Sequence, residues 1–205
     1  MRRPRVALAA AFAAASVSAC APQAPAVDAE KLRRARMMED LMTGRGAVGG
    51  PFTLTDHHGA RRSLAEFRGR LVLLYFGYTF CPDVCPTDLV ELGALLRRLG
   101  RDARRVQVLF VTLDPERDSA KHLEAYLGAF DGRILGLTGE AQEVRAVARR
   151  YKAYFAKVPA GSTYLVEHSA NFYLIDGQGG FAGSLPPGTK AERLEDIVRE
   201  HLAAR

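Results

Sequence analysis

Two cysteines carry the chemistry that is easiest to recognise in this sequence. Cys81 and Cys85 are separated by three residues in the segment Cys81-Pro82-Asp83-Val84-Cys85. Such a pair suits a structural disulfide, a redox-active dithiol or a thiolate metal site. A disulfide closing so short a loop would stabilise the domain by only ~2 kcal/mol on the loop-entropy account, and redox pairs usually have two intervening residues. A metal site is therefore favoured, with the other two as alternatives.

The donor set indicates which metal such a site would hold. Two thiolates and an imidazole make a soft set of three ligands. Structural zinc is usually enclosed by four ligands, and the sequence offers no convincing fourth. Cu(I) accepts soft thiolates and is satisfied by three donors. The pattern therefore favours copper.

The third donor must be chosen from five histidines. His168 lies where a predicted hairpin ends and the next strand is about to begin, so a loop could bring it over the cysteine turn. His122 and His201 are expected on exposed helix surfaces. His57 and His58 belong to a turn, where a weak metal role stays open. Position alone makes His168 the leading candidate without deciding the matter.

The elements around the cysteines predict where the site lies. Residues 71–76 form a continuous apolar run, which is typical of a strand buried on both faces. Pro86 has no N–H and is best tolerated in the first turn of a helix. The apolar spacing over 88–99 predicts that helix, and Gly100 ends it. Cys85 therefore lies near a helix N-terminus and Cys81 in the turn before it, at the carboxyl edge of the sheet.

The remaining elements alternate between strand and helix, with no internal repeat and no second domain boundary. This alternation predicts an α/β fold with a mixed central sheet covered by helices on both faces. Strands are expected at 53–54, 106–113, 134–137 and 172–175, helices from 118 or 119 to 130, over 140–151 and over 190–202, and a hairpin from 154–158 and 164–166.

Composition excludes several classes of protein. A hydrophobic share of 48% with 25% charged residues supports a folded core and argues against both a disordered chain and an integral membrane protein. The net charge of +6 falls to +3 when Arg2, Arg3 and Arg5 are removed with a leader. Without a basic stripe or motif, no nucleic-acid function is expected.

The N-terminus has the pattern of an export signal. Residues 1–5 are basic and 6–17 are apolar, too short a run to span a bilayer but suited to a signal peptide. Val17-Ser18-Ala19-Cys20 resembles a bacterial lipobox, in which Cys20 is lipidated; the alternative is cleavage after Ala19 with a free Cys20. We expect a signal peptide at 1–19, a lipidated tether at 20–47 and a domain at 48–205. The expected location is a membrane-anchored lipoprotein facing the periplasm or cell exterior.

The tether contains a helix, expected over residues 30–42. Met37, Met38 and Met42 lie in it, and methionine is a soft copper ligand. Packing of an apolar helix face on the domain is the favoured interpretation of these methionines.

Over residues 48–203 the sequence resembles the Sco/SenC family of copper proteins. The most specific shared segment is the cysteine block from Leu74 to Pro86, and Glu167-His168-Ser169 supports it. Further supporting segments are Val48–Leu54, Leu113–Asp118 and Ile134–Gly139.

The resemblance implies a thioredoxin-like fold with a hairpin insertion. It implies one copper ion per chain, as Cu(I) with Cu(II) as a second state, held by Cys81, Cys85 and His168. The implied function is a copper chaperone for the CuA site of cytochrome c oxidase, more a carrier than an enzyme. The alternatives are a thiol–disulfide oxidoreductase acting on the acceptor's cysteines and a copper or redox sensor. The implied partners are the CuA-bearing subunit, other periplasmic copper carriers or thiol reductants, and the membrane through the lipid anchor.

Two features depart from the family pattern. Glu167 stands where the family commonly has aspartate, which is expected to alter the orientation of the neighbouring imidazole. A lipobox stands in place of the transmembrane helix of many members. The residues from Asp114 to Asp118 are interpreted as turn and capping residues, with partner recognition as the alternative.

Overall fold

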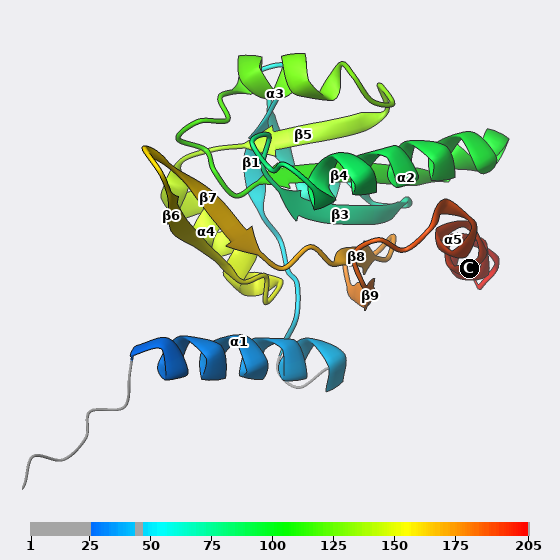
Figure 1. Ribbon diagram of the computed structural model, residues 1–205. Helices are drawn as coiled ribbons and strands as arrows, with labels where there is room; N and C mark the ends of the chain where they lie inside the picture. Colours follow the sequence, from blue (N-terminus) through cyan, green and yellow to red (C-terminus); the bar gives the residue numbers. More distant parts are fainter. Residues whose placement is uncertain (1–25, 44–46, 205) are drawn as a thin grey trace, which may run out of the picture.

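The computed structural model describes residues 26–43 and 47–204 of the chain (Figure 1). The predicted signal peptide at 1–19 and the lipidation site Cys20 lie outside the described residues.

One seven-stranded mixed sheet forms the centre of the molecule, in the order β2-β1-β5-β4-β3-β8-β9. The strands β3, β4 and β5 are parallel, and the outer pairs are antiparallel. The strands are β1 (Thr53–Asp56), β2 (Arg61–Ser63), β3 (Leu71–Gly77), β4 (Val106–Thr112), β5 (Ile134–Thr138), β8 (Phe172–Ile175) and β9 (Phe181–Leu185).

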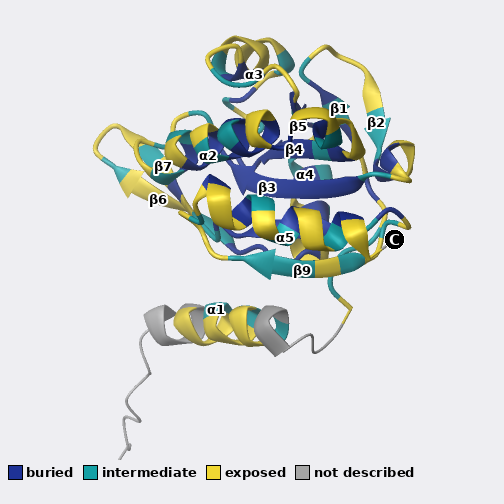
Figure 2. Cartoon of the chain, turned by 90° about the vertical axis from the view of Figure 1, so that its right-hand side faces the viewer, coloured by how far each residue is buried: buried dark blue, intermediate teal, exposed yellow. Residues whose placement is uncertain are grey.

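Helices cover both faces of this sheet, as the alternation of elements predicted. Successive side chains of a strand point to opposite faces, so Tyr75 and Phe76 of β3 lie on opposite sides. Helices α2 (Val84–Arg98) and α5 (Ala191–Ala203) pack in front of the sheet, and α4 (Ala141–Arg150) lies behind it (Figure 2). The Phe76 ring meets that of Tyr151, just after α4, at 6.0 Å between centroids. Helix α3 (Ala120–Leu127) packs against β5.

A separate two-stranded hairpin is inserted between α4 and β8. Its strands are β6 (Phe155–Ala160) and β7 (Thr163–His168), paired from Phe155 opposite His168 to Ala160 opposite Thr163. Gly161, with φ of 63°, takes the left-handed conformation that the turn requires. The two-residue period of β7 places Tyr164, Val166 and His168 on one face, and the burial of Val166 shows that this face is turned toward the domain.

Some boundaries differ from those predicted. Helix α2 begins at Val84, which places Pro86 in its first turn as predicted, although the apolar spacing that indicated the helix starts only at residue 88. The edge strand β2 and the short 3-10 helices η1 (Leu64–Phe67) and η2 (Gly100–Arg105) were not predicted, because segments this short lack a hydrophobic period.

Helix α1 (Ala26–Thr43) runs beneath the domain in both views (Figures 1 and 2). It contains the predicted tether helix and is longer. Met38 is 41% exposed, so the predicted packing of apolar side chains is not met at that position. Among the helices that the structure describes, none combines the length and the apolar character needed to cross a membrane.

Candidate metal centre

The connection from β3 to α2 positions both cysteines. After β3 ends at Gly77, a tight turn brings the Cys81 N–H within 3.3 Å of the Tyr78 carbonyl oxygen, to which it donates. Cys85 follows in the first turn of α2 and is fully buried, while Cys81 is half-buried. The two cysteines are not joined by a disulfide in the structure. The predicted placement at the carboxyl edge of the sheet is confirmed.

His168 is the last residue of strand β7, and its imidazole lies next to the two cysteines. Its Nε2 lies 3.5 Å from Cys85 Sγ, and the donor atoms of Cys81, Cys85 and His168 lie within 4.8 Å of one another. His168 Nδ1 is 3.1 Å from the backbone oxygen of Ser169 and donates to it, so Nε2, which lies toward the sulfurs, is the ring nitrogen that would bind a metal. Within residues 26–43 and 47–204, these three side chains form a group that could hold one metal ion.

The two thiols differ in their protonation. A hydrogen bond from the Cys85 thiol lowers the pKa of Cys81 far below its ordinary value, and His168 and the backbone N–H groups of Asp83 and Cys85 lower it further. The same hydrogen bond, together with burial and the negative charge of Cys81, raises the pKa of Cys85. The reduced pair therefore contains a Cys81 thiolate and a Cys85 thiol that donates to it.

This asymmetry predicts the pH dependence of alkylation. Only a thiolate is nucleophilic, and a lowered pKa keeps Cys81 ionised as the pH falls. Between pH 8 and pH 6 an ordinary thiol should lose roughly a hundredfold in rate, whereas Cys81 of the metal-free chain should keep nearly the same rate with iodoacetamide. Mass spectrometry of the modified peptides measures this. A rate at Cys81 that falls in parallel with that of free cysteine would contradict the assignment.

Gly77 is a site residue that the sequence analysis missed. A Cβ atom at this position would lie 2.8 Å from Cys85 Sγ and 2.7 Å from Cε2 of Phe110, and real Cβ atoms do not approach that closely. The absence of a side chain at Gly77 therefore lets the buried sulfur sit against β3. A glycine as the last residue of a buried strand, eight residues before a cysteine, was the available signal.

Gly77→Ala should displace the Cys85 sulfur. Overpacking of a tight core costs about 1–3 kcal/mol, and the displaced sulfur should also weaken metal binding. Chemical denaturation and Cu(I) titration of the same variant measure the two effects. Gly132→Ala is the control, because a Cβ there meets nothing within 4 Å; equal behaviour of the two variants would count against a close approach at Gly77.

Asp118 clamps the loop that precedes Cys81. Its buried carboxylate accepts from the Thr79 N–H at 3.0 Å, the Thr79 hydroxyl at 2.6 Å and the Thr112 hydroxyl at 2.6 Å. The cap of α3 is instead Ser119, whose side chain accepts from the His122 N–H. Of the two predicted cap residues, Asp118 and Ser119, the structure confirms Ser119. Asp118 is not the cap, since its side chain turns inward to tie this loop to the end of β4.

Asp114 and Arg117 hold the hairpin that carries His168. The Tyr164 hydroxyl donates to buried Asp114 at 2.9 Å, and Arg117 donates to the Tyr164 carbonyl at 3.1 Å and to Asp114. The guanidinium also lies 3.8 Å above the Tyr164 ring. These residues were interpreted as turn and capping residues, with partner recognition as the alternative, yet they join the loop after β4 to β7 and so contribute to the position of the imidazole.

Two buried polar side chains lie beside Cys85 on the α2 side of the sheet. Asp88 Oδ1 accepts from the Gly188 N–H at 2.9 Å. Its Oδ2 and the Tyr75 hydroxyl have no hydrogen-bond partner with good geometry among the described residues. Burial raises the pKa of Asp88 and that of Tyr75. Asp88 therefore retains a proton more readily than an exposed carboxyl group would.

Glu167 does not orient the imidazole of its neighbour. Its carboxylate forms an ion pair with Arg34 of α1 at 2.7 Å and is about half exposed. The backbone oxygen of Ser169 occupies His168 Nδ1 instead. The expectation that a longer carboxylate alters the ring orientation was wrong, because side chains of successive strand residues point to opposite faces.

The remaining histidines lie outside this group. His57 and His58 form the predicted turn, where His57 Nδ1 accepts from the Gly136 N–H at 2.8 Å. His122 is exposed, as predicted, and stacks on the ring of Phe80 at 5.3 Å between centroids. His201 lies in the last turn of α5, where its Nδ1 donates to the Ile197 carbonyl at 2.9 Å.

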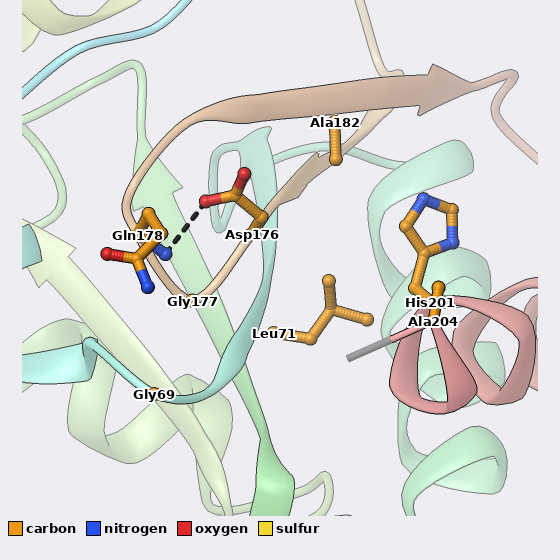
Figure 3. A pocket seen from close by; sticks show the side chains of 8 residues that line it. All are labelled: Gly69, Leu71, Asp176, Gly177, Gln178, Ala182, His201 and Ala204. Atoms are coloured by element: carbon orange, nitrogen blue, oxygen red, sulfur yellow. Dashed lines mark hydrogen bonds between the residues drawn. The ribbon is translucent and has the colours of Figure 1, made fainter.

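His201 lines a cavity at the opposite end of the sheet (Figure 3). This cavity of about 560 Å³ adjoins Leu71, the first residue of β3, whereas the cysteines follow the last. Among the described residues that line it, Asp176 carries a carboxylate, which accepts from the N–H groups of Gln178 and Gly180 and so closes the β8–β9 turn. The cavity is therefore separate from the candidate metal centre.

Comparison with known proteins gives a consistent match. The sequence model of the SCO1/SenC family matches residues 41–203. The bovine protein SCO2 homolog, mitochondrial, is 41% identical over 184 residues, which cover 87% of this chain and 69% of that protein. Yeast SCO1, mitochondrial, is 39% identical over 163 residues, covering 78% of this chain and 55% of the relative.

Solved structures with the same fold include copper-bound proteins. Copper-bound ScoI of Bradyrhizobium japonicum superposes with a TM-score of 0.71 at 38% identity, covering 76% of this chain and 99% of that one. Copper-bound yeast Sco1 superposes with a TM-score of 0.71 at 38% identity, covering 78% and 91%. The thioredoxin-like fold predicted with a hairpin insertion is confirmed.

These relatives correct the expected location. The bovine, mouse, human and yeast relatives are mitochondrial proteins by name, whereas the sequence predicted a membrane-anchored lipoprotein facing the periplasm or cell exterior. That prediction was wrong. It depended on residues 1–20, whose arginines, serines and lack of acidic residues are shared by export signals and mitochondrial leaders, so the composition could not distinguish the two.

Proposed function

The chain belongs to the SCO1/SenC family, and we propose that it is a copper chaperone that carries one copper ion on Cys81, Cys85 and His168 and supports maturation of the CuA site of cytochrome c oxidase. The observation that carries the proposal is the convergence of two sulfurs and one imidazole nitrogen within 4.8 Å. The copper-bound Sco relatives, at 38% identity, support the choice of metal.

The residues around the donors suit a carrier. Cys81 is already ionised, so it can bind a metal without first losing a proton. Cys85 must release its thiol proton when its sulfur binds the metal. With three donors, two of them on half-buried residues (Cys81 and His168), an incoming ligand from an acceptor can reach the ion, which a closed cage of four ligands would hinder. Copper would be the cargo, and the three side chains would hold it in place.

A second function has its own supporting observation, the Cys81 thiolate next to the Cys85 thiol. As a thiol–disulfide oxidoreductase, Cys81 would attack an acceptor disulfide and form a mixed disulfide. Cys85 would then displace the second acceptor sulfur. The acceptor gains two electrons and is released as two thiols, with one proton from Cys85 and the second from water because Cys81 starts as a thiolate. Cys81 and Cys85 become a disulfide.

A transfer experiment distinguishes the two functions. The copper-loaded chain is mixed with a CuA-bearing domain whose two cysteines are reduced, and the metal-free reduced chain is mixed with the same domain as a disulfide. A chaperone transfers copper to the acceptor in the first mixture, and metal analysis of the two proteins after they are separated measures that transfer. An oxidoreductase yields acceptor thiols in the second. Failure of the first mixture to transfer copper, with rapid reduction in the second, would overturn the chaperone proposal.

A further inference from the structure

A cavity of about 250 Å³ lies between α1 and the domain, next to the metal centre. His168 lines it from the domain, and Met38 lines it from α1. His168 thus belongs both to the lining of the cavity and to the group that contains the two cysteines. A ligand that reaches this cavity is therefore adjacent to one of the three proposed copper donors.

Two ion pairs fasten α1 over this cavity. Arg34 pairs with Glu167 at 2.7 Å, and its guanidinium lies 4.5 Å above the ring of Tyr154. Asp40 pairs with Lys152 at 3.6 Å. These contacts lie one turn before and half a turn after Met38 along the helix, so they hold this part of α1 at the cavity.

The packing of Met38 does not explain its position. A methionine that fills a hydrophobic core is buried, but Met38 is 41% exposed. Its neighbour Met37 lines a different cavity, with Arg145, Arg149 and Phe155, and His168 is not among the residues that line it. The two methionines therefore form a natural comparison, because only Met38 shares a cavity with a candidate copper donor.

We propose that Met38 is a transit ligand that binds Cu(I) transiently on its way to or from the centre formed by Cys81, Cys85 and His168. This inference rests on the proposed copper-carrying function. A thioether is a soft, uncharged donor that suits Cu(I) and needs no deprotonation. The exchange leaves copper in the same oxidation state, since one bond to a donor ligand breaks as the bond to the Met38 sulfur forms, and that bond breaks in turn when the centre binds the ion.

A kinetic comparison tests this role. Cu(I) is offered to the reduced full chain as its coloured bicinchoninate complex, and loss of colour is followed by stopped flow. Met38→Leu should slow copper uptake by about tenfold, the lower end of what losing an outer-shell partner costs a metal site, with unchanged equilibrium affinity. Met37→Leu, the matched control, should behave like the parent chain. A Met38→Leu chain as fast as the parent, or one with a lower affinity, would overturn a transit role.

A second variant separates the sulfur from the position of the helix. Arg34→Gln removes the clamp to Glu167, so it should slow uptake to a similar degree. If both act through one docked methionine, the double variant should be no slower than either single variant. Additive slowing would show that Met38 does not act through the docked helix and would contradict the inference.

Direct binding can be observed without the main site. In the Cys81→Ser, Cys85→Ser chain with labelled methionine methyl groups, one equivalent of Ag(I), a redox-inert substitute for Cu(I), should shift the Met38 resonance and leave that of Met37 in place. Equal shifts, or none, would reject a specific thioether site. If the parent chain itself fails to bind Cu(I) tightly, the proposed function fails; tight binding with no effect at Met38 rejects only this inference.

Discussion

His168→Ala is expected to weaken Cu(I) binding by more than about a hundredfold, because loss of a ligand should exceed the 10–100-fold cost of losing an outer-shell partner. The imidazole supplies the one nitrogen among the three donors, 3.5 Å from Cys85 Sγ. The remaining two thiols leave copper without its third ligand. Competition with a Cu(I) chelator of known affinity measures the loss, and X-ray absorption should count two sulfurs and one nitrogen in the parent chain.

The control for this substitution is His201→Ala. His201 lines the cavity at the opposite end of the sheet (Figure 3), so its loss should leave the Cu(I) affinity unchanged. An equal affinity of the parent chain and His168→Ala would contradict the three-donor centre. The His168→Ala chain keeps both cysteines, so its rate of disulfide reduction can also be compared with that of the parent chain.

Asp118→Ala is expected to lower the free energy of unfolding by about 3 kcal/mol or more, because each buried donor left without a partner costs roughly 1–3 kcal/mol. Three donors from Thr79 and Thr112 converge on this carboxylate. The loop between β3 and Cys81 should also become mobile, so copper affinity should fall as well. Urea denaturation followed by circular dichroism measures the stability of the metal-free chain.

Asp102→Ala serves as the comparison for Asp118→Ala. Its carboxylate pairs with Arg199 at 3.0 Å on the surface, where an ion pair contributes at most about 1 kcal/mol. A similar small loss for both variants would show that the three hydrogen bonds of Asp118 add little. A large loss at Asp118 alone supports its role as the clamp of the cysteine loop.

The local pattern of the sequence was sufficient for most of the fold. The apolar run over 71–76 predicted a strand buried on both faces, and β3 (Leu71–Gly77) is such a strand. The helical spacing of apolar residues after Pro86 predicted α2. Such signals are local, because each is contained in one short segment, and the different periods of helices and strands distinguish the two. The edge strand β2 was missed because three residues are too few to show a period.

The sequence by itself determined which residues could bind a metal and where the cysteines lie in a strand–turn–helix unit. Only the tertiary structure decided that His168, 83 residues beyond Cys85, meets them, because the meeting depends on how a hairpin packs and not on any local period. It also decided that Gly77 leaves room for a sulfur, that Asp118 points inward, and that Met38 shares a cavity with His168. Contacts between distant segments follow from the packing of the whole chain, so a single sequence does not reveal them.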